Sequence, residues 1–280
     1  MAHVTVGLVH PGEMGSVVGR IAREGGARVL WASEGRSQAS RDRAETAGLL
    51  DVATLASLAA QSDMIFSVCP PHSAVEVARG VAARGFTGVY LDANAISPRI
   101  ARDLGKILGE GGAQFVDGGI VGPPPKGPGT TRLYLSGSGA SRIAGLFEKS
   151  PVEAIILDGP PGAASALKVA YAAYSKGTAA LLMAIRALAI QEGVDDVLLQ
   201  EWGRSLPDLP GRSEAAIRGN ARKAWRFVGE MEENAATFAD AGLPQGFSQA
   251  AAEVYRRLAD YKDSPKPPSV AEMAAALWQR

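Results

Sequence analysis

The 280-residue sequence predicts an α/β domain with a doubly wound, mostly parallel sheet, followed by an all-α domain that a long interdomain helix joins to it. Two observations predict this architecture. In the first half, short apolar segments alternate with helix-like segments, which is typical of parallel strands covered on both faces. After the breaker Gly159-Pro160-Pro161-Gly162 only helical periodicity remains. We therefore predict two domains, residues 1–160 and residues 161–280.

Each predicted element follows from its own pattern. Strands are expected where β-branched and apolar residues run together, at residues 4–9, 28–33, 64–69, 88–92, 114–117, 131–136 and 154–158. Helices are expected between them at residues 14–24, 37–47, 74–84 and 98–110. Residues 163–192 contain no Pro and one Gly and predict a helix of about 45 Å. Further helices are predicted at residues 195–204, 213–220, 222–241 and 245–261, with a short last helix after the Pro-rich residues 264–268.

Composition limits the classes of partner. Lys and Arg together number 29, as do Asp and Glu, so the net charge is zero and neither a nucleic acid nor a membrane surface is expected as a partner. The N-terminus lacks the basic region and cleavage site of a signal peptide, and no apolar run is long enough to span a bilayer. The single cysteine, Cys69, fits a reducing compartment. We therefore expect a cytoplasmic protein.

A glycine-containing loop follows the first predicted strand. Gly12 and Gly15 have the spacing of the second and third glycines of a dinucleotide-binding loop, and His10 stands in the place of the first. In a Rossmann domain, such a loop lets backbone N–H groups approach the cofactor pyrophosphate at the N-terminus of the next helix. An ordinary strand–turn–helix connection is the competing interpretation. The predicted cofactor contacts here are His10, Pro11, Gly12, Glu13 and Met14.

The end of the second predicted strand bears on the choice between NADP and NAD. In an NAD-binding Rossmann domain, an acidic residue there usually binds the ribose 2′-hydroxyl. Here Arg36 follows the strand, and a guanidinium suits the 2′-phosphate of NADP, with Ser33 and Ser37 adding hydroxyl contacts. We therefore predict NADP(H) as the cofactor. The nearby Glu34 keeps NAD open, and a solvated charged turn is the interpretation without a ligand.

Motifs along nearly the whole chain resemble the β-hydroxyacid dehydrogenase superfamily, which includes 6-phosphogluconate dehydrogenase-like enzymes and imine reductases. Residues 11–15, Pro-Gly-Glu-Met-Gly, resemble its glycine loop. Residues 92–98 are similar to its Asp-x-Ser-Thr-x-x-Pro segment beside the nicotinamide, and residues 68–70 match the strand end that flanks the cofactor. The resemblance implies that Cys69, Pro70, Asn94 and Ala95 lie at the cofactor. His72, at the cofactor side of the sheet, is a further candidate, although a solvated or capping role is an equal alternative.

The superfamily's catalytic lysine lies in a Gly-x-Gly-x-x-x-Lys pattern that opens the interdomain helix. Residues 162–168 match this pattern and end at Lys168, with Ala164 in place of the second Gly. The chain most resembles the subgroup whose C-terminal helical domain has no assigned function, on the basis of Lys-Val-Ala-Tyr at 168–171, Lys-Gly at 176–177, and residues 229–232 and 241–244. Tyr171 and Lys176 follow on roughly the same face of the helix as Lys168. We predict these three residues as the catalytic group, against the alternative of solvent-exposed residues on a long helix.

The predicted chemistry is hydride transfer between the nicotinamide and a small carbonyl or alcohol substrate. Lys168 would give or take the hydroxyl proton, helped by a pKa lowered by partial burial and the cationic nicotinamide. The substrate-binding residues would be Val121 and Gly122 together with Lys168, beside Ala95. In the superfamily a Ser stands at the place of Val121, so the usual small β-hydroxyacid substrate is in doubt. No cluster of metal-ligand spacing is evident, and hydride transfer of this kind requires no metal.

Three alternatives stay open. NADPH-dependent imine reduction is the first, favoured by Val121 and Tyr171 although imine reductases usually replace the lysine. A non-catalytic NADP-binding protein that senses redox state or acts as a scaffold is the second. Oxidative decarboxylation is the third, and the chain is short for it. Because the long apolar helix is hard to bury in a monomer, and because the resemblance implies it, we expect a homodimer with interlocked helical domains.

Overall fold

The computed structural model describes residues 4–278, which form two compact units. The first unit ends at Lys168 and the second begins at Val169, eight residues after the predicted boundary and inside one helix. Residues 1–3, which contribute to the expectation that there is no signal peptide, lie outside the described part of the chain. No helix among the described residues is both long and apolar enough to cross a membrane.

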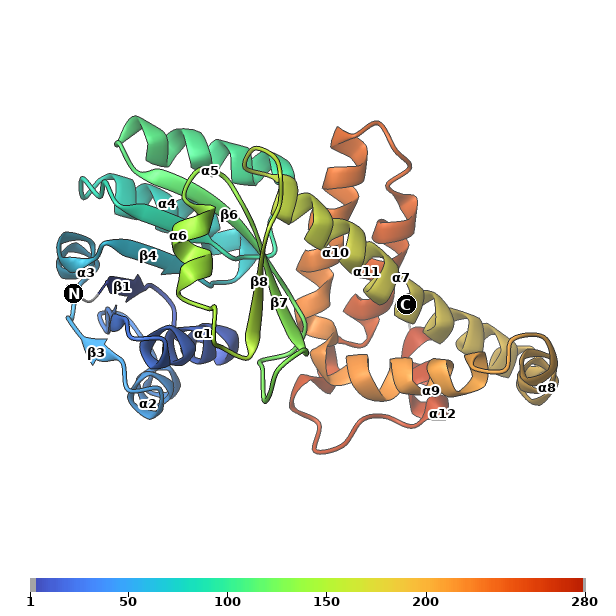
Figure 1. Ribbon diagram of the computed structural model, residues 1–280. Coiled ribbons are helices and arrows are strands. Elements are labelled where there is room, and N and C mark those ends of the chain that lie inside the picture. The colour runs from blue at the N-terminus through green and yellow to red at the C-terminus, as the bar shows by residue number, and fades with distance from the viewer. Residues whose placement is uncertain (1–3, 279–280) are drawn as a thin grey trace. The chain divides into compact units, whose positions relative to one another are not determined.

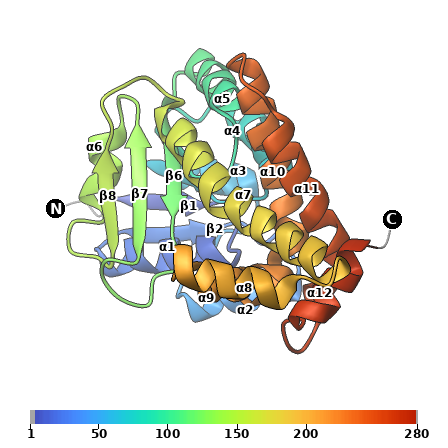
Figure 2. The same ribbon diagram turned by 90° about the vertical axis from the view of Figure 1, so that its right-hand side faces the viewer.

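The first unit is built on an eight-stranded sheet in the order β3-β2-β1-β4-β5-β6-β7-β8. The first six strands are mutually parallel, β7 is antiparallel to β6, and β8 is parallel to β7. Figure 2 shows β6, β7 and β8 side by side. The strands are β1 (Thr5–Leu8), β2 (Arg28–Trp31), β3 (Leu50–Asp51), β4 (Met64–Ser67), β5 (Val89–Asp92), β6 (Gln114–Val121), β7 (Thr131–Ser136) and β8 (Val152–Ile156).

The strand order places a topological switch between β1 and β4. From β1 the chain first proceeds outward to β2 and β3 and then returns to continue with β4 on the other side of β1. In open α/β sheets, ligands bind at such a switch, beside the carboxyl ends of the strands. The loops after β1 and β4 therefore flank the expected cofactor crevice.

Helices cover both faces of this sheet (Figure 1). Side chains of α1, α2 and α6 pack into one apolar core with the sheet, and side chains of α3, α4 and α5 pack into another on the opposite face. Ser97 caps α5 by accepting a hydrogen bond from the Ile100 amide, and Pro98 occupies the first turn. The helices are α1 (Glu13–Glu24), α2 (Gln38–Thr46), α3 (Leu55–Gln61), the 3₁₀ turn η1 (Pro71–Ser73), α4 (Ala74–Ala82), α5 (Pro98–Glu110) and α6 (Ala140–Gly145).

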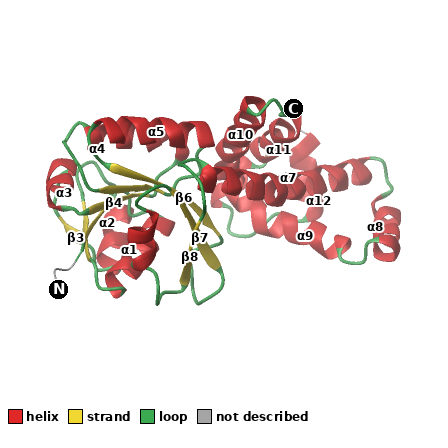
Figure 3. Ribbon diagram, turned by 45° about the horizontal axis from the view of Figure 1, so that its top comes forward, coloured by secondary structure: helices red, strands yellow, loops and turns green. Residues whose placement is uncertain are grey.

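The second unit is helical throughout (Figure 3), and the 29-residue helix α7 (Ala163–Gln191) leads into it from the first unit. Its core gathers Met183, Met231, Tyr255 and Met273 with other apolar side chains. A buried Arg186 ties three helices together: its guanidinium bonds both carboxylate oxygens of Asp195 and the Ser213 hydroxyl. The other elements are α8 (Asp195–Ser205), α9 (Leu209–Asn220), η2 (Ala221–Lys223), α10 (Ala224–Asp240), α11 (Gly246–Arg257), η3 (Ala259–Asp263) and α12 (Val270–Trp278).

The predicted fold class is confirmed, and most predicted elements are present with boundaries shifted by a few residues. Besides the 3₁₀ turns, one strand and two α-helices escaped prediction: β3, α3 and α6. The reason is length, because β3 has two exposed residues and α6 has six residues, too few to show a periodicity. Strand β6 runs four residues beyond its predicted end because Gly118 and Gly119, which predict a break, are part of the ladder with β7.

Candidate cofactor and active site

The glycine loop between β1 and α1 has the geometry of a phosphate-binding turn. A Cβ atom at Gly15 would lie 2.2 Å from the His10 carbonyl oxygen, so only glycine lets the helix start this close to the strand end. A Cβ atom at Gly12 would meet nothing within 4 Å, and no side chain caps the N-terminus of α1 there. The loop is also fixed from α2, where Arg43 Nε donates to the Pro11 carbonyl oxygen over 2.9 Å. The loop thus presents open space at a helix N-terminus, which fits a pyrophosphate.

Two buried nitrogen atoms beside this loop have no hydrogen-bond partner. They are His10 Nδ1 and Arg36 Nε, and the third such atom among residues 4–278 is the Tyr90 hydroxyl oxygen. Burial, and then the charge of Arg36, lowers the pKa of His10 to about 4. The imidazole is therefore neutral at pH 7 and lies within the field of the guanidinium. Unpartnered buried polar atoms are rare in folded proteins, and these two mark a place where a ligand can supply partners.

The two serines predicted to bind the cofactor have partners within the protein. Ser37 is the N-cap of α2 and accepts a hydrogen bond from the Ser40 amide. Ser33 is buried and forms hydrogen bonds with the Asp51 carboxyl group. Burial raises the pKa of Asp51, but the hydrogen bonds from Ser33 and the Ala53 amide and the charge of Arg41 outweigh this effect, so that the pKa is lowered. Both serines lie beside Arg36, and both also serve the local structure.

The ends of β4 and β5 are joined by a buried amide. Asn94, which is 2% exposed, accepts a hydrogen bond from the Cys69 amide at 2.5 Å. Its Nδ2 atom donates to Asp92 Oδ2 at 2.7 Å and to Ser67 Oγ at 3.1 Å, and its own backbone N–H donates to Asp92 Oδ1. Asn94 therefore fixes the loop at Cys69 against the next strand, and both of its amide hydrogens are used within the protein.

The carboxyl group of Asp92 is fully buried in this network. Burial raises its pKa to about 7, an effect that the nearby Asp117 strengthens and that Asn94 and the charge of Lys168 oppose. Burial also raises the pKa of the Cys69 thiol to about 11, so the thiol is protonated at neutral pH and is a poor nucleophile. The hydroxyl of Tyr90 is buried beside the same groups, and burial together with Asp92 raises its pKa.

A second buried carboxylate, Asp117, holds the N-terminus of α7. It lies directly opposite Asp92 in the parallel pairing of β5 and β6. Its Oδ2 atom accepts hydrogen bonds from the amides of Gly162 and Ser165 at 2.9 and 3.0 Å and from the Ser136 hydroxyl at 3.2 Å. Its Oδ1 atom accepts from the Ser165 hydroxyl at 2.5 Å. A carboxylate at a helix N-terminus is favoured by the helix dipole, so Asp117 fixes where α7 begins.

The first turns of α7 place Lys168 against β6. A Cβ atom at Gly119 would lie 2.7 Å from the Ala164 carbonyl oxygen and 3.4 Å from Lys168 Cβ, so the absence of a side chain lets the helix approach the strand. Val121, buried, and Gly122, exposed, follow at the end of β6. Lys168 therefore lies at the carboxyl edge of the parallel sheet, the edge at which the glycine loop also lies.

The other two residues of the predicted catalytic group lie in the helical unit. Lys176 Nζ forms an ion pair with Glu230 at 2.7 Å and lies 5.0 Å from the centre of the Phe227 ring. The Tyr255 hydroxyl donates to the Lys176 carbonyl oxygen. Tyr171, three residues after Lys168 on α7, is half exposed. Lys176 thus already has an acidic partner within its own unit.

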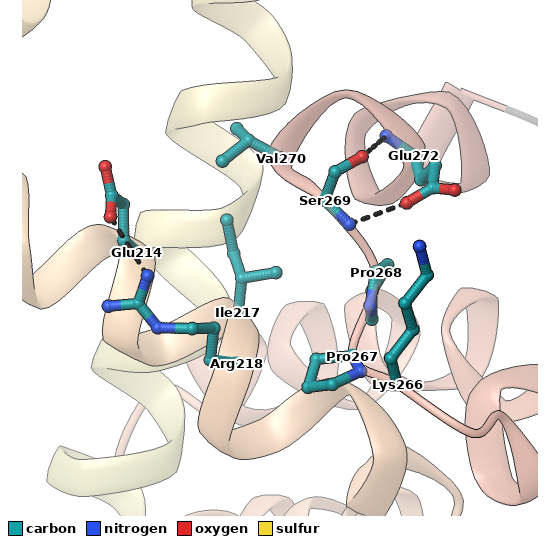
Figure 4. Close-up of a pocket in the computed structure, with 9 residues that line it drawn as sticks. All are labelled: Glu214, Ile217, Arg218, Lys266, Pro267, Pro268, Ser269, Val270 and Glu272. Atoms are coloured by element: carbon teal, nitrogen blue, oxygen red, sulfur yellow. Dashed lines mark hydrogen bonds and ion pairs between the residues drawn. The ribbon is translucent and has the colours of Figure 1, made fainter.

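The remaining predicted contacts surround the ends of β4 and β5. Pro70 and His72 are exposed, and Ala95 is half-buried. A separate cavity of about 300 Å³ lies in the helical unit between α9 and the segment before α12, where Arg218 is paired with Glu214 (Figure 4). None of the predicted site residues lines it. Within residues 4–278, no three His, Cys, Asp or Glu side chains gather in a way that would hold a metal ion.

Sequence reasoning missed three residues that organise this edge of the sheet. Asp92 and Asp117 appeared only as the last residues of two predicted strands, with Asp92 also opening the segment at residues 92–98, and Arg43 was not considered. The sequence does contain a signal for Asp92 and Asp117, because each follows an apolar run that predicts a buried strand. A charged residue at such a position needs buried partners. Arg43 has no comparable signal, since its partner is a backbone carbonyl 32 residues earlier.

Comparison with solved structures identifies the fold class of the chain. A 3-hydroxyisobutyrate dehydrogenase of Mycobacterium tuberculosis, solved with L-serine, superposes with a TM-score of 0.74 at 17% identity, over 99% of both chains. A reductive aminase of Aspergillus terreus, solved with NADPH and ethyl levulinate, superposes with a TM-score of 0.58 at 18% identity, over 98% of this chain and 99% of the aminase. The chain therefore has the fold of the hydroxyacid dehydrogenases, which confirms the predicted resemblance at the level of fold.

Part of the helical region matches a known protein family. Residues 189–258 match a family described as a domain of unknown function, DUF1932. This match confirms the predicted likeness to a subgroup whose C-terminal helical domain has no assigned function. An uncharacterised 28.5 kDa protein of Methanothermus fervidus is 27% identical over 232 residues, which is 81% of this chain and 89% of that protein.

Proposed function

We propose that the protein is an NADP(H)-dependent oxidoreductase that transfers hydride between the nicotinamide and a small carbonyl or alcohol substrate. One observation carries this proposal: the open glycine loop and Lys168 lie at the same carboxyl edge of the parallel sheet. Hydride chemistry on a Rossmann domain needs these two parts, a cofactor cradle and a group that handles the substrate proton. The likeness in fold to a hydroxyisobutyrate dehydrogenase supports the reaction class.

The cofactor site would be formed by the glycine loop and the turn after β2. The N-terminus of α1 and Gly12 suit the pyrophosphate, and Arg36 suits the 2′-phosphate that distinguishes NADP from NAD. When bound, NADPH supplies the hydride. Asn94 would act as a positioning residue here, because it fixes the Cys69 loop from within rather than offering a free amide.

Lys168 would donate a proton to the carbonyl oxygen during reduction and accept it from the hydroxyl during oxidation. The substrate would lie against Val121 and Gly122, at the end of the strand that Lys168 covers. Asp92 would act through Lys168 as a positioning residue, since the charges of the two groups influence each other. Tyr171 and Lys176 are proposed as supporting groups, and the ion pair of Lys176 with Glu230 has to open before Lys176 can contact a substrate.

The test is NADPH oxidation with a panel of small ketones, aldehydes and keto acids. Lys168→Met removes the proton donor and is expected to lower kcat by about 10² to 10⁴ while leaving NADPH binding intact. Lys168→Arg keeps the charge, but its guanidinium does not release a proton, so activity should stay low. Lys106→Met is the matched control at an exposed lysine on α5 and should keep full activity. Full activity in Lys168→Met would contradict the role of Lys168.

Imine reduction is the second candidate. Val121 has no hydroxyl or charge to bind a substrate carboxylate, and the fold is shared with a reductive aminase solved with NADPH. The same assay, with ketone and primary amine together, distinguishes the candidates. An amine-dependent increase in NADPH consumption favours imine reduction, whereas activity on the carbonyl alone favours the dehydrogenase. Tight NADPH binding with no turnover on either panel would favour a non-catalytic redox sensor or scaffold.

We also propose a homodimer formed through the helical unit, and a cytoplasmic location that rests on the single cysteine. Tyr174, Leu181 and Leu188 recur at seven-residue spacing on α7 and are each more than half exposed, as is Val197 on α8. A long apolar stripe of this kind is typical of a helix that packs against a second chain. Light scattering after size exclusion tests this proposal, and a stable monomer at micromolar concentration would contradict it.

A further inference from the structure

His10 stands where dinucleotide loops have their first glycine, and the structure shows what its side chain faces. The residue does not adopt a positive φ, so the backbone at this point does not require glycine and a side chain is tolerated. Its Nδ1 atom is buried without a partner, as is Arg36 Nε. These two atoms come from the loops after β1 and β2, which are adjacent parallel strands. Two buried nitrogen atoms without partners therefore lie in loops that follow neighbouring strands, and the charge of Arg36 acts on His10.

The two groups are coupled by charge. Arg36 is the charged residue that, after burial, lowers the pKa of His10, and its charge also acts on the Cys69 thiol after β4. The guanidinium is therefore close enough to the loops after β1 and β4 for its charge to act on a residue in each. Because the neighbouring charge is the positive charge of Arg36, the imidazole of His10 stays neutral. Its Nδ1 atom has no hydrogen-bond partner in the free protein.

Other charged groups around the loop do not change this balance. Arg43 on α2 is held by the Pro11 carbonyl, and Arg41 on the same helix donates to the Ser33 carbonyl. Glu13 at the start of α1 and Glu34 after β2 are exposed to solvent. Among the described residues, no carboxylate contributes to the shift at His10. The surroundings of the imidazole are cationic until an anion binds.

We propose that His10 and Arg36 form one subsite for the 2′-phosphate of NADP(H), and that the imidazole takes up a proton when this phosphate binds. The inference rests on the proposed NADP(H) function. A phosphate monoester carries a charge of about −1.5 to −2 at pH 7 and three acceptor oxygens. Placed against Arg36, it reverses the local charge, favours the imidazolium and accepts hydrogen bonds from both orphaned nitrogens. NAD(H), which has no 2′-phosphate, leaves His10 neutral.

Calorimetric titration of the full chain with NADP⁺ tests the proton uptake. The heat of binding is measured at pH 7 in PIPES and in Bis-Tris, which differ in ionisation enthalpy, so the difference reports protons exchanged. Wild type is expected to take up at least about a quarter of a proton more per NADP⁺ than His10→Asn, because an imidazole restored to its ordinary pKa of 6.5 is about one quarter protonated at this pH. With NAD⁺, wild type and variant should exchange the same number of protons. Equal uptake by both proteins with NADP⁺ would overturn the proposal.

A second measurement needs no variant. NMR follows the carbon-bound imidazole protons of His10 as a function of pH, in the free protein and with each cofactor bound. Addition of NADP⁺ should move the titration midpoint of His10 upward by two or more pH units, whereas NAD⁺ should leave it near its value in the free protein. An unchanged midpoint with bound NADP⁺ would overturn the inference and leave the proposed function standing. Failure of wild type to bind either cofactor would overturn the proposed function itself.

Discussion

Two groups of buried polar residues at the carboxyl edge of the sheet differ in how they are satisfied. Just after the end of β5, Asn94 uses both of its amide hydrogens within the protein, and in the neighbouring β6 Asp117 accepts four hydrogen bonds. At the ends of β1 and β2, His10 and Arg36 each keep a buried nitrogen without a partner. The first group holds the fold together. The second group is arranged for a partner that the chain itself does not provide.

The difference distinguishes residues that position the loops of the site from residues that bind a ligand. A polar group whose hydrogen bonds all lie within the protein contributes to stability, and its loss exposes unsatisfied donors. An orphaned group costs stability in the free protein and regains it on binding. Tyr90, within β5, is an exception, since its buried hydroxyl has no hydrogen-bond partner although Asp92 and Ser67 act on it. Substitutions in the two groups should therefore separate stability from affinity.

The largest expected effect is at Asp117. Asp117→Ala leaves two backbone amides and two hydroxyls at the start of α7 without an acceptor. We expect a loss of about 3–5 kcal/mol in the free energy of unfolding, measured by urea titration. Asp158→Ala, at an exposed carboxylate after β8, is the control and should cost less than about 0.5 kcal/mol. A small loss at Asp117 would show that α7 begins where it does for another reason.

The next effect is the pH dependence that Asp92 imposes. Its folded pKa of about 7 is raised above the ordinary value of 3.8, so its contribution to stability is present at low pH and is lost as pH rises through 7. His10 acts in the opposite sense, with stability lost as pH falls from 6.5 towards 4. The comparison with Asp92→Asn isolates the carboxyl group. Relative to wild type, the variant should gain about 3 kcal/mol between pH 5 and pH 8. A difference that is the same at both pH values would contradict the raised pKa of the buried Asp92 carboxyl group.

A smaller effect is expected at Asn94. Asn94→Ala removes the bridge between Asp92 and the Cys69 amide, and about 2 kcal/mol should be lost because a buried amide and a carboxylate lose their partners. The KM for NADPH should rise more than kcat falls, since the variant displaces the loop that flanks the cofactor rather than the proton donor. An unchanged KM would assign Asn94 a purely structural role.

The smallest effect on stability is expected at Arg36. Arg36→Ala removes a guanidinium whose Nε atom has no partner, so the free energy of unfolding should change by less than about 0.5 kcal/mol. Urea titration of the free protein measures this. A loss of 2 kcal/mol or more would show that Arg36 supports the fold, and the contrast between the two groups would fail.

Sequence patterns predicted the architecture well where burial is continuous. The strands β4 and β5 are buried at every position, and such strands appear as apolar runs that cannot be mistaken for a surface helix. The antiparallel β7 was predicted as a strand, but its direction was not, because direction depends on the nine-residue connection between Val121 and Thr131 rather than on the strand itself. Two-residue β3 carries no pattern of its own.

Within the site, motif and spacing predicted the segments but not the partners. Arg36 was predicted as a cofactor contact because it follows the second predicted strand. The effect of its charge on the pKa of His10 depends on the side-chain rotamers of both residues, which the local sequence does not determine. The stripe of Lys168 and Lys176 follows from helical periodicity. The ion pair of Lys176 with Glu230 joins residues 54 positions apart and has no local signal. Long-range partners of this kind are the part that only the structure provides.

The central claim is that the loops after β1 and β2 bind NADP(H) in preference to NAD(H). The most direct measurement is a fluorescence titration of wild type and Arg36→Ala with NADPH and with NADH. We expect tighter binding of NADPH by wild type, a loss of about ten- to a hundred-fold in Arg36→Ala, and little change for NADH, because a charge-assisted hydrogen bond contributes about 1.5–3 kcal/mol. Equal binding of both cofactors, unaffected by Arg36, would contradict it and would make Glu34 the ribose ligand.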